Sequence, residues 1–346
     1  MSKLAGETSE TAVVDTALDQ AELLAAARLL AQAEDVTLLA HVNPDADALG
    51  SALALGLALH RRGARVRVSF GAPAEVPESL RDLDVAGLLV PPNQVPKAPP
   101  LLVVMDTGSV SRLGPLGGRV AATTAAGGHV LVIDHHVTNT RFGTHNLVDD
   151  RAEATVVLAA RLLDALQVPL DEPIARCLYA GLVTDTRSFR HASASTHLLA
   201  ARLLAAGVDP EATTRPLLDT HPFGWLGMLS KVLASAQLEL DAARGLGLVH
   251  TLVRRSDAVG MRSEEVDSVV DLVRTTAEAE VAAVLKEIGP RRWTVSLRAT
   301  GRIDVGAAAT ALGGGGHRLA SGFTATGSAE QVLAALRAAL DQAPLL

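Results

Sequence analysis

The stretch that decides the fold is VTLLAHVNPDADALGS, residues 36–51. Its first five residues form an apolar run that predicts a buried strand, and a turn containing Pro44 separates this strand from a helical pattern over residues 48–62. Similar apolar runs, each followed by turn residues, occur at 65–70, 101–105 and 129–133. Because helical patterns lie between several of these runs, we expect an α/β fold with a doubly wound, mostly parallel sheet.

Helical and strand-like patterns divide the rest of the chain. Helical spacing of apolar residues recurs at 16–34, 152–166, 172–184, 196–206 and 223–236. A smaller α/β region follows, with strand-like runs at 247–253, 280–288 and 293–299, a short helix at 304–311, a four-glycine loop and a helix at 329–341. We therefore expect a disordered N-terminus (1–15), a catalytic domain (16–225), a helical linker (226–239) and a smaller C-terminal α/β domain (240–346).

Composition limits the class of protein and its partners. Of the 346 residues, 48% are hydrophobic and 20% are charged, which is enough apolar material for a sizeable core. The 38 acidic and 31 basic residues give a net charge of −7, which argues against binding of long duplex nucleic acid. Only 2% of the residues are aromatic, so side chains for base stacking are scarce.

Cysteine content and apolar run lengths indicate the compartment. Cys177 is the single cysteine, so an intramolecular disulfide and a cysteine-based zinc site are excluded. The first fifteen residues lack the basic head and apolar core of a signal peptide. No apolar run reaches about 18 residues, the length that a membrane span needs. We expect a cytoplasmic protein that does not enter a membrane.

Ligand-type side chains follow the first strand directly. His41, Asp45 and Asp47 lie at the carboxyl end of a parallel strand, where the ligand sites of α/β sheets collect. Imidazole together with carboxylates suits Mn²⁺, Fe²⁺ or Zn²⁺ and, less well, Mg²⁺. An alternative interpretation is that Asp45 or Asp47 only caps the helix that starts at Ala48.

Acids and histidines recur at the ends of the neighbouring elements. Asp106 follows the run 101–105, Asp134-His135-His136 follows 129–133, and Asp185 follows a helical stretch that ends at 184. Taken singly, each acid is more often a turn or capping residue than a ligand. Independent capping does not predict that acids and histidines converge on one rim of a sheet. A metal site is therefore the better interpretation.

Four segments together resemble the motifs of the DHH phosphoesterases. They are HVNPDADALGS (41–51), MDTGS (105–109), IDHH (133–136) and LVTDT (182–186). The later segments SLRATGRIDV (296–305) and GGGGHRLASG (313–322) are similar to the DHH-associated C-terminal domain with its glycine-rich substrate loop. The resemblance covers about residues 36–326, and the length of the chain is most like the nanoRNase and pAp phosphatase group of this family.

The resemblance implies a centre with two divalent ions. Mn²⁺ is the first expectation, with Mg²⁺, Fe²⁺ or Co²⁺ as alternatives. One ion would be held by His41, Asp45 and Asp106, and the other by Asp47, Asp106, His135 and Asp185, with Asp106 bridging the pair. Asp134 and His136 would be the catalytic pair, in which the acid orients a histidine and His136 faces the substrate phosphate. Together the ions would activate a bridging hydroxide that attacks phosphorus.

Substrate contacts are expected from cationic and backbone groups. Four ligand carboxylates and two divalent ions cancel, so the charge of the substrate phosphates must be met elsewhere. The residues expected to meet it are Arg298, Gly314, Gly315, Gly316, His317 and Arg112. Glycine lets backbone N–H groups approach an anion closely, although a glycine run alone is equally a flexible loop. For Arg112 the alternative is a solvated surface arginine.

We therefore expect a metal-dependent phosphoesterase whose active site lies in the cleft between the two domains. Its substrates would be short: oligoribonucleotides of a few units, pAp (cleaved to AMP and phosphate), or linear or cyclic di-AMP. A homodimer is compatible with the resemblance. The alternatives are an inorganic pyrophosphatase and a catalytically silent nucleotide- or RNA-binding protein on the same fold. One departure is Arg187, which stands where the family pattern has glycine and either narrows the pocket or adds a phosphate contact.

Overall fold

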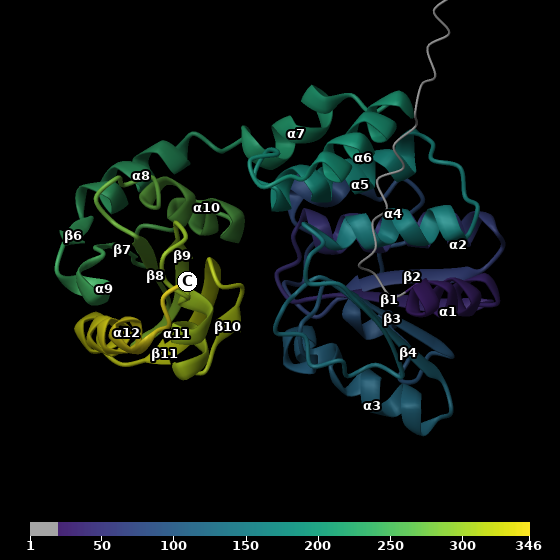
Figure 1. The fold of residues 1–346 in the computed structure, drawn as a ribbon, viewed down its shortest axis with the longest axis horizontal. Coiled ribbons are helices and arrows are strands. Elements are labelled where there is room, and N and C mark those ends of the chain that lie inside the picture. The colour runs from purple at the N-terminus through teal and green to yellow at the C-terminus, as the bar shows by residue number, and fades with distance from the viewer. Residues whose placement is uncertain (1–19) are drawn as a thin grey trace, which may run out of the picture. The chain divides into compact units, whose positions relative to one another are not determined.

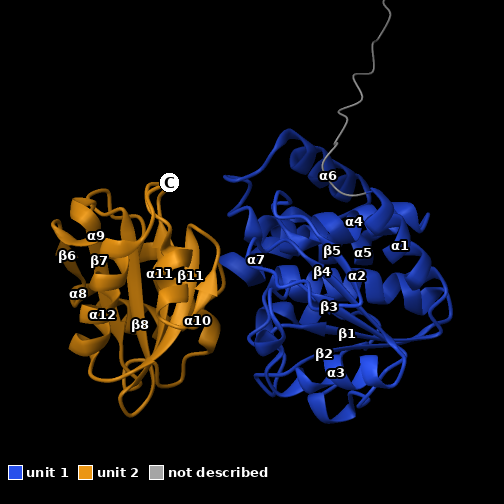
Figure 2. Ribbon diagram, turned by 60° about the horizontal axis from the view of Figure 1, so that its bottom comes forward, with its two compact units in different colours: residues 1–218 blue, residues 219–346 orange. Residues whose placement is uncertain are grey.

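The computed structural model describes residues 20–346. The chain divides into two compact units, residues 1–218 and residues 219–346, called here the first and the second unit (Figure 2). Each unit has its own β-sheet and its own hydrophobic core. Segment 1–15, which we expected to be disordered, lies outside the described residues.

The first unit is built on a five-stranded sheet in which all neighbouring strands are parallel. In spatial order the strands are β2 (Arg65–Phe70), β1 (Asp35–Ala40), β3 (Leu101–Met105), β4 (His129–Asp134) and β5 (His145–Val148). This 2-1-3-4-5 order confirms the predicted doubly wound sheet. Strand order reverses between β1 and β3, and the crevice outside the carboxyl ends of such a strand pair is where ligands bind in open α/β sheets.

Helices cover both faces of this sheet (Figure 1). One face packs against α1 (Gln20–Ala31), α2 (Ala46–Arg61), α4 (Thr155–Ala165) and α5 (Glu172–Asp185). The other packs against α3 (Gly118–Ala125) and the preceding 3₁₀ turn Val110–Leu116. Alternate strand residues serve the two faces, as Leu38 and Leu39 do in β1. Two more helices, α6 (Ala194–Ala205) and α7 (Pro210–Leu218), complete the first unit.

A close crossing of α2 and α5 brings two acids toward each other. A Cβ on Gly50 of α2 would lie 2.3 Å from the carbonyl oxygen of Cys177 in α5. A Cβ on Gly181 of α5 would lie 2.8 Å from the Cα of Asp47 in α2. Only glycine permits this approach of two helix backbones. The crossing places the first turn of α2, which carries Asp47, against the last turn of α5, which ends at Asp185.

The second unit contains a six-stranded mixed sheet. Its spatial order is β10 (Gly315–Gly316), β11 (Ala320–Thr326), β9 (Arg292–Ala299), β8 (Val281–Gly289), β7 (Leu248–Val253) and β6 (Gln237–Glu239). Strands β7 and β8 are parallel, and the other neighbours are antiparallel. Its helices are α8 (Gly224–Ala234), α9 (Ala242–Gly245), α10 (Ser263–Val273), α11 (Val305–Ala311) and α12 (Ala329–Gln342). The smaller C-terminal α/β domain is thereby confirmed as a fold class.

All the predicted strands are present, and the sequence missed several elements with weak patterns. Strand β5 buries only Leu147, and β11 reads ASGFTAT, a run of small and polar residues rather than an apolar one. Helices α3, α7 and α10 were also missed. Among residues 20–346, no helix combines the length and the apolar character that crossing a membrane requires.

Candidate metal centre

The acids and histidines that the sequence singled out come together at the carboxyl edge of the sheet in the first unit. His41 directly follows β1, Asp106 directly follows β3, and Asp134 is the last residue of β4. Asp106 has a φ of 52°, a left-handed conformation that Asp tolerates better than most side chains, so the chain turns sharply as it leaves β3. The crossing of α2 and α5 supplies two further acids. The convergence expected from the strand ends is therefore present.

His41, Asp45 and Asp106 form the first cluster. The Nε2 atom of His41 lies 3.5 Å from Asp45 Oδ2 and 3.4 Å from Asp106 Oδ2. Its other ring nitrogen, Nδ1, lies 2.8 Å from the carbonyl oxygen of Val42, which fixes the orientation of the ring. Nε2 is buried and has no hydrogen-bond partner among the described residues. Two ligand atoms of one ion, each roughly 2.1 Å from it, lie roughly 3–3.5 Å apart, so these residues fit a divalent cation.

Asp45 has both of the roles that the sequence left open. Its Oδ1 accepts a hydrogen bond of 3.0 Å from the backbone N–H of Ala48, so Asp45 is the N-cap of α2. Its Oδ2 faces His41 in the first cluster. The two oxygens of one carboxylate therefore divide the tasks of helix capping and ligand presentation.

Asp47, His135 and Asp185 form the second cluster. The Nε2 atom of His135 lies 3.2 Å from Asp185 Oδ2 and 3.9 Å from Asp47 Oδ2. It also lies 3.5 Å from Asp106 Oδ1. The two oxygens of Asp106 therefore face different clusters, Oδ2 toward His41 and Oδ1 toward His135. A carboxylate in this position can bridge two cations.

His136 is held by a chain of polar contacts beside the clusters. Its Nδ1 lies 2.7 Å from Oδ1 of Asp134, a carboxylate with no exposed surface. Oδ2 of Asp134 accepts a hydrogen bond of 2.5 Å from Asn139. Nη1 of Arg112 lies 3.4 Å from Nε2 of His136, so Arg112 belongs to the same neighbourhood. Asp134 thus orients His136 and leaves its far nitrogen toward Arg112.

The pKa values of His41 and Asp106 show that the first cluster attracts positive charge, either as protons or as a bound cation. Although burial opposes it, the carboxylates of Asp45 and Asp106 raise the pKa of His41 to about 10. Burial is likewise outweighed at Asp106, where His136, His41 and His135 hold the pKa of the carboxyl well below its usual range. A divalent cation would replace the protons that the raised pKa values of His41 and His135 favour.

In the second cluster, burial and neighbouring carboxylates act on the acids in the same direction. Burial, Asp185 and Asp106 raise the pKa of Asp47 well above its usual range. Burial also raises the pKa of Asp185, and nearby Asp45 and Asp106 add to the effect while His135 opposes it. Carboxylates with raised pKa values are short of positive charge in their surroundings. The cluster is therefore a favourable place for a divalent ion.

The substrate residues predicted in the second unit lie at one end of its sheet. Arg298 is near the end of β9 and pairs in register with Ala320 of β11. Its Nε lies 3.9 Å from Asp271 Oδ1, so its charge is partly met within the unit. His317 follows β10 directly, and its backbone N–H donates a hydrogen bond of 2.7 Å to Ala320. Arg298 and His317 are thereby both tied to the same residue of β11.

The glycine run forms a tight hairpin rather than an open loop. Gly315 and Gly316 pair with Gly322 and Ser321 as β10 and β11. A Cβ on Gly314 would lie 2.1 Å from the carbonyl oxygen of Gly322, so this position accepts only glycine. The N–H of Gly314 donates to the carbonyl oxygen of Ala309. Glycine is therefore required at this position by close packing, not by an N–H group that is available to a ligand.

Arg187 begins a strained turn immediately after the second cluster. Arg187, Ser188 and Phe189 have φ values of 52°, 56° and 63°, all left-handed and none of them glycine. Hydrogen bonds hold the turn, since Ser188 N donates to Val183 O and Phe189 N donates to the hydroxyl of Thr186. Arg187, which stands where the family pattern has glycine, therefore has a conformation that glycine would adopt without strain.

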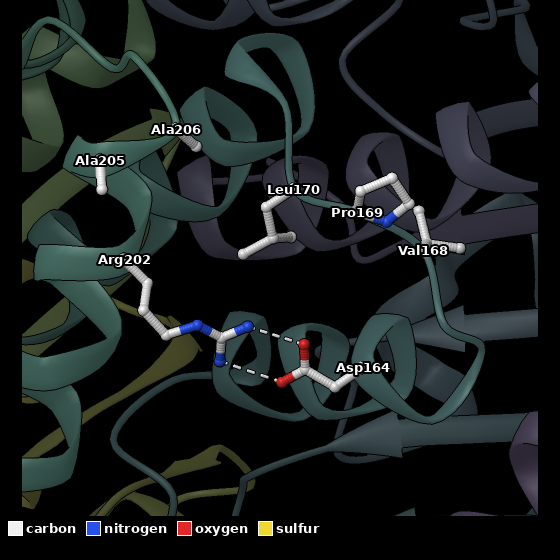
Figure 3. Close-up of a pocket in the computed structure, with 7 residues that line it drawn as sticks. All are labelled: Asp164, Val168, Pro169, Leu170, Arg202, Ala205 and Ala206. Carbon is white, nitrogen blue, oxygen red and sulfur yellow. Dashed lines mark hydrogen bonds and ion pairs between the residues drawn. The ribbon is translucent and has the colours of Figure 1, made fainter.

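A separate depression of about 380 Å³ lies away from these residues (Figure 3). Its lining comes from α4, α6 and the segment that leads into α5, with Val168, Pro169, Leu170, Ala205 and Ala206 around an ion pair. Asp164 accepts hydrogen bonds of 3.0 and 2.7 Å from Arg202, and both side chains are about half exposed. The two charges satisfy each other, so neither side chain offers an unpaired charge to a ligand.

Two contributors to the centre escaped the sequence analysis. Asn139 bridges Asp134 to the carbonyl oxygen of Thr107, which lies 3.1 Å from its Nδ2. The hydroxyl of Thr155 donates a hydrogen bond of 2.8 Å to Asp106 Oδ1. Neither residue belongs to a segment that carried the family resemblance. An uncharged side chain in a loop or at a helix start gives no signal until the fold places it beside an acid.

Two family models match the chain. One is described as the DHH family, N-terminal domain, and matches residues 35–182; the other is described as the DHHA1 domain and matches residues 248–343. The bifunctional oligoribonuclease and PAP phosphatase NrnA of Thermus thermophilus is 34% identical over 316 residues, which cover 88% of this chain and 90% of the relative. The probable bifunctional oligoribonuclease and PAP phosphatase NrnA of Streptococcus mutans is 24% identical over 299 residues, 84% of this chain and 89% of the relative.

A solved structure shares the fold. The crystal structure of an exopolyphosphatase-related protein from Bacteroides fragilis aligns with a TM-score of 0.82 at 20% sequence identity. The alignment covers 94% of this chain and 97% of the other. At this level of identity the likeness concerns the fold alone.

Proposed function

This chain belongs to the DHH family, and from that premise we propose that it hydrolyses phosphate esters of short nucleotides with two divalent metal ions. The names of its relatives support a hydrolase that acts on nucleotides. The proposed substrates are oligoribonucleotides of a few units, pAp, and linear or cyclic di-AMP. The relatives named as oligoribonuclease and PAP phosphatase act, by those names, on the first two of these classes.

The observation that carries the proposal is the position of Asp106 between two histidine-containing clusters. Its two oxygens lie 3.4 Å from His41 and 3.5 Å from His135, and the carboxylate is almost completely buried. A buried carboxylate so placed can serve two ions at once. The residues that would hold one ion are His41, Asp45 and Asp106, and those for the other are Asp47, Asp106, His135 and Asp185.

The protein's own residues would prepare the substrate phosphate for attack. When bound, a pair of divalent ions supplies polarisation of the phosphoryl oxygen and acidification of a nearby water. Asp134 keeps His136 oriented, and the far nitrogen of His136 would face the phosphate or the leaving oxygen. Arg112, which lies next to that nitrogen, would add positive charge.

The second unit would bind the remainder of the same substrate. Four ligand carboxylates and two divalent ions sum to zero, so any further phosphate needs cationic partners from elsewhere. Arg298 and His317 lie around the glycine hairpin and would provide them. The net charge of −7 and the aromatic content of 2% fit a protein that binds phosphates and chain ends more than long strands or base identity.

A manganese-supplemented substrate panel tests the proposal. The panel contains pAp, di- to pentanucleotides, cyclic di-AMP, a long single strand and pyrophosphate, each with and without a chelator. We expect hydrolysis of the short nucleotides, rates that fall as the strand lengthens, and loss of activity with the chelator. Pyrophosphate turnover far above nucleotide turnover would identify a pyrophosphatase instead. Binding of nucleotides without any hydrolysis or any Mn²⁺ uptake would identify a silent binding protein.

A further inference from the structure

The segment that starts helix α4, residues 152–156, touches three residues of the candidate metal centre. It lies outside the motifs that carry the family resemblance and contains no acid that faces the clusters. Its contacts go to His135, Asp47 and Asp106. Two of these residues belong to the second cluster, and the third is the acid that both clusters share.

The first contact orients the histidine of the second cluster. Nδ1 of His135 lies 3.0 Å from the carbonyl oxygen of Ala152, and this contact is buried. A carbonyl oxygen only accepts, so Nδ1 carries a proton, and Nε2, which faces Asp185 and Asp106, is the nitrogen that would bind an ion. A histidine that binds a metal is commonly fixed in this way by an acceptor on its other nitrogen.

The second contact holds Asp47 at the N-terminus of the helix. The backbone N–H of Thr155 donates to Asp47 Oδ2 at 2.6 Å, and that of Val156 donates to Oδ1 at 2.8 Å. Asp47 is fully buried, and both of its oxygens are thereby anchored. The first N–H groups of a helix have no partners within the helix and favour an anion, so α4 steadies a charge that burial disfavours. Each carboxylate oxygen keeps a second lone pair for an ion.

The third contact fixes the shared acid. The hydroxyl of Thr155 donates to Asp106 Oδ1, the oxygen that faces His135. Thr155 has no exposed surface, so water does not replace this hydroxyl in the folded protein. Asp106 Oδ2, which faces His41, is not the atom that Thr155 contacts. The hydroxyl therefore acts on one side of the shared carboxylate.

The segment is itself tied to the end of β4. The N–H of Ala152 donates to the carbonyl oxygen of Asp149, and the N–H of Asp149 donates to that of Asp134. The buried carboxylate of Asp149 also accepts from the backbone N–H of Arg151 and lies 3.6 Å from Nη1 of Arg161 in α4. The segment thus has a rigid base on the same strand that presents His135.

We propose that residues 152–156 position the second cluster selectively, with Thr155 as a positioning residue for one of the two metal positions. The proposal rests on the proposed function, because it concerns the ions that this function requires. Thr155 itself does not touch the substrate or an ion. Loss of its hydroxyl releases Asp106 Oδ1 and weakens the position between His135 and Asp185, whereas the position at His41 and Asp45 keeps its geometry.

Calorimetric titration of the full chain with Mn²⁺ tests this selectivity without reference to activity. For Thr155→Val, which keeps the side-chain shape and the backbone N–H, we expect one of two Mn²⁺ affinities to fall about 10- to 100-fold while the other stays within about threefold. Thr155→Ser restores the hydroxyl and is expected to bind both ions like the wild type. Thr123→Val is the matched control, since Thr123 is equally buried in α3 and its hydroxyl has no partner among the described residues.

The outcomes separate this proposal from the proposed function. Two unchanged Mn²⁺ affinities in Thr155→Val, or an equal fall at both positions, would overturn the selective role of Thr155 and leave the proposed function standing. A wild-type protein that takes up no Mn²⁺ would overturn both. If Thr155→Val does not fold, Thr155→Ala and Thr155→Ser are compared, and loss of one affinity in the first but not in the second supports the proposal.

Discussion

Two groups of charged side chains, one in each unit, contain carboxyl groups whose pKa values are shifted in opposite directions, although burial raises the pKa in both. In the second unit, Glu239 of β6 accepts hydrogen bonds of 2.7 and 2.6 Å from Arg337 of α12 and lies 2.7 Å from Nε2 of His250. In the first unit, by contrast, burial and neighbouring carboxylates raise the pKa values of Asp47 and Asp185. One group brings its own positive charge, and the other is short of it.

This difference distinguishes a structural cluster from a functional one. Hydrogen bonds from Arg337 and His250 lower the pKa of Glu239 to about 2 even though partial burial opposes them, so this group holds an edge strand to a helix without any ligand. The two clusters, which share Asp106, bring four carboxylates together with two histidines. Both groups are polar and partly or wholly buried, so burial alone does not distinguish them. The site that needs cations is the one whose carboxylates outnumber its positively charged partners.

Removal of the shared acid is expected to have the largest effect. In Asp106→Ala both clusters lose a ligand, so Mn²⁺ uptake should be lost and hydrolysis of short nucleotides should fall about a thousandfold or more. Metal content after gel filtration and initial rates measure these effects. Asp82→Ala removes an exposed acid of the 3₁₀ turn Glu78–Leu83 and serves as the control, with unchanged metal content and rate. Near wild-type hydrolysis in Asp106→Ala would contradict the role of the clusters.

Addition of metal is expected to stabilise the first unit. It should not affect the group of Glu239, His250 and Arg337 in the second unit, called here the charge-matched group. At a free Mn²⁺ concentration about 100 times the Kd, each site adds about 2.7 kcal/mol to the free energy of unfolding. Thermal melts with Mn²⁺ and with a chelator measure the gain, which should be absent in Asp106→Ala. An equal gain in wild type and variant would mean that the ions bind elsewhere.

Glu239→Gln breaks the charge-matched group and should change stability alone. Loss of charge-assisted hydrogen bonds is expected to lower the free energy of unfolding by about 1–2 kcal/mol at neutral pH, with unchanged Mn²⁺ affinity. Because the folded pKa of about 2 lies below the ordinary value of 4.5, this contribution is present above pH 4.5 and disappears as the pH falls toward 2. Wild type and variant should therefore converge in acid.

Denaturant titrations from pH 7 to pH 3 measure this convergence. Glu278→Gln, at an exposed position of the same unit, is the control and should follow the wild type throughout. A stability gap that does not shrink between pH 4.5 and pH 3, or a change in Mn²⁺ affinity, would contradict the purely structural role of Glu239.

The smallest expected effect concerns the strained turn beside the second cluster. Arg187→Gly relieves a left-handed φ of 52° and should raise the free energy of unfolding by up to about 1 kcal/mol, since glycine adopts this conformation without steric cost. Arg28→Gly, inside helix α1, should instead lower it by about 1 kcal/mol. Urea unfolding of both variants measures the contrast. A loss of stability in Arg187→Gly would mean that the side chain stabilises the turn more than its backbone strains it.

The sequence was sufficient for four of the five strands of the first unit's sheet and for the ligand-type residues. Buried parallel strands are continuous apolar runs, and the acids that follow them must meet at one edge because all five strands point the same way. His41, Asp106 and His135 could therefore be placed near one another before any coordinates. The position of Asp185 was harder, since it depends on the crossing of two helices at Gly50 and Gly181.

The supporting contacts could not be predicted. Thr155 lies inside a helical pattern that began at residue 152 in the sequence, whereas α4 begins at Thr155 itself. Its N–H and hydroxyl reach Asp47 and Asp106, residues 108 and 49 positions away in the chain. No local pattern encodes such pairings. Strand β11 was missed for a similar reason. Its small residues pack closely against Gly314 and Gly316, a contact that no local pattern in the sequence reveals.

Anomalous diffraction from crystals of the protein grown with Mn²⁺ shows directly whether two ions bind on the two sides of Asp106. We expect two manganese peaks in the first unit, one among His41, Asp45 and Asp106 and the other among Asp47, His135, Asp185 and Asp106. Glu239 and Arg337 should show no manganese peak between them. The absence of peaks at Asp106, or manganese between Glu239 and Arg337 instead, would rule out a two-ion centre at Asp106.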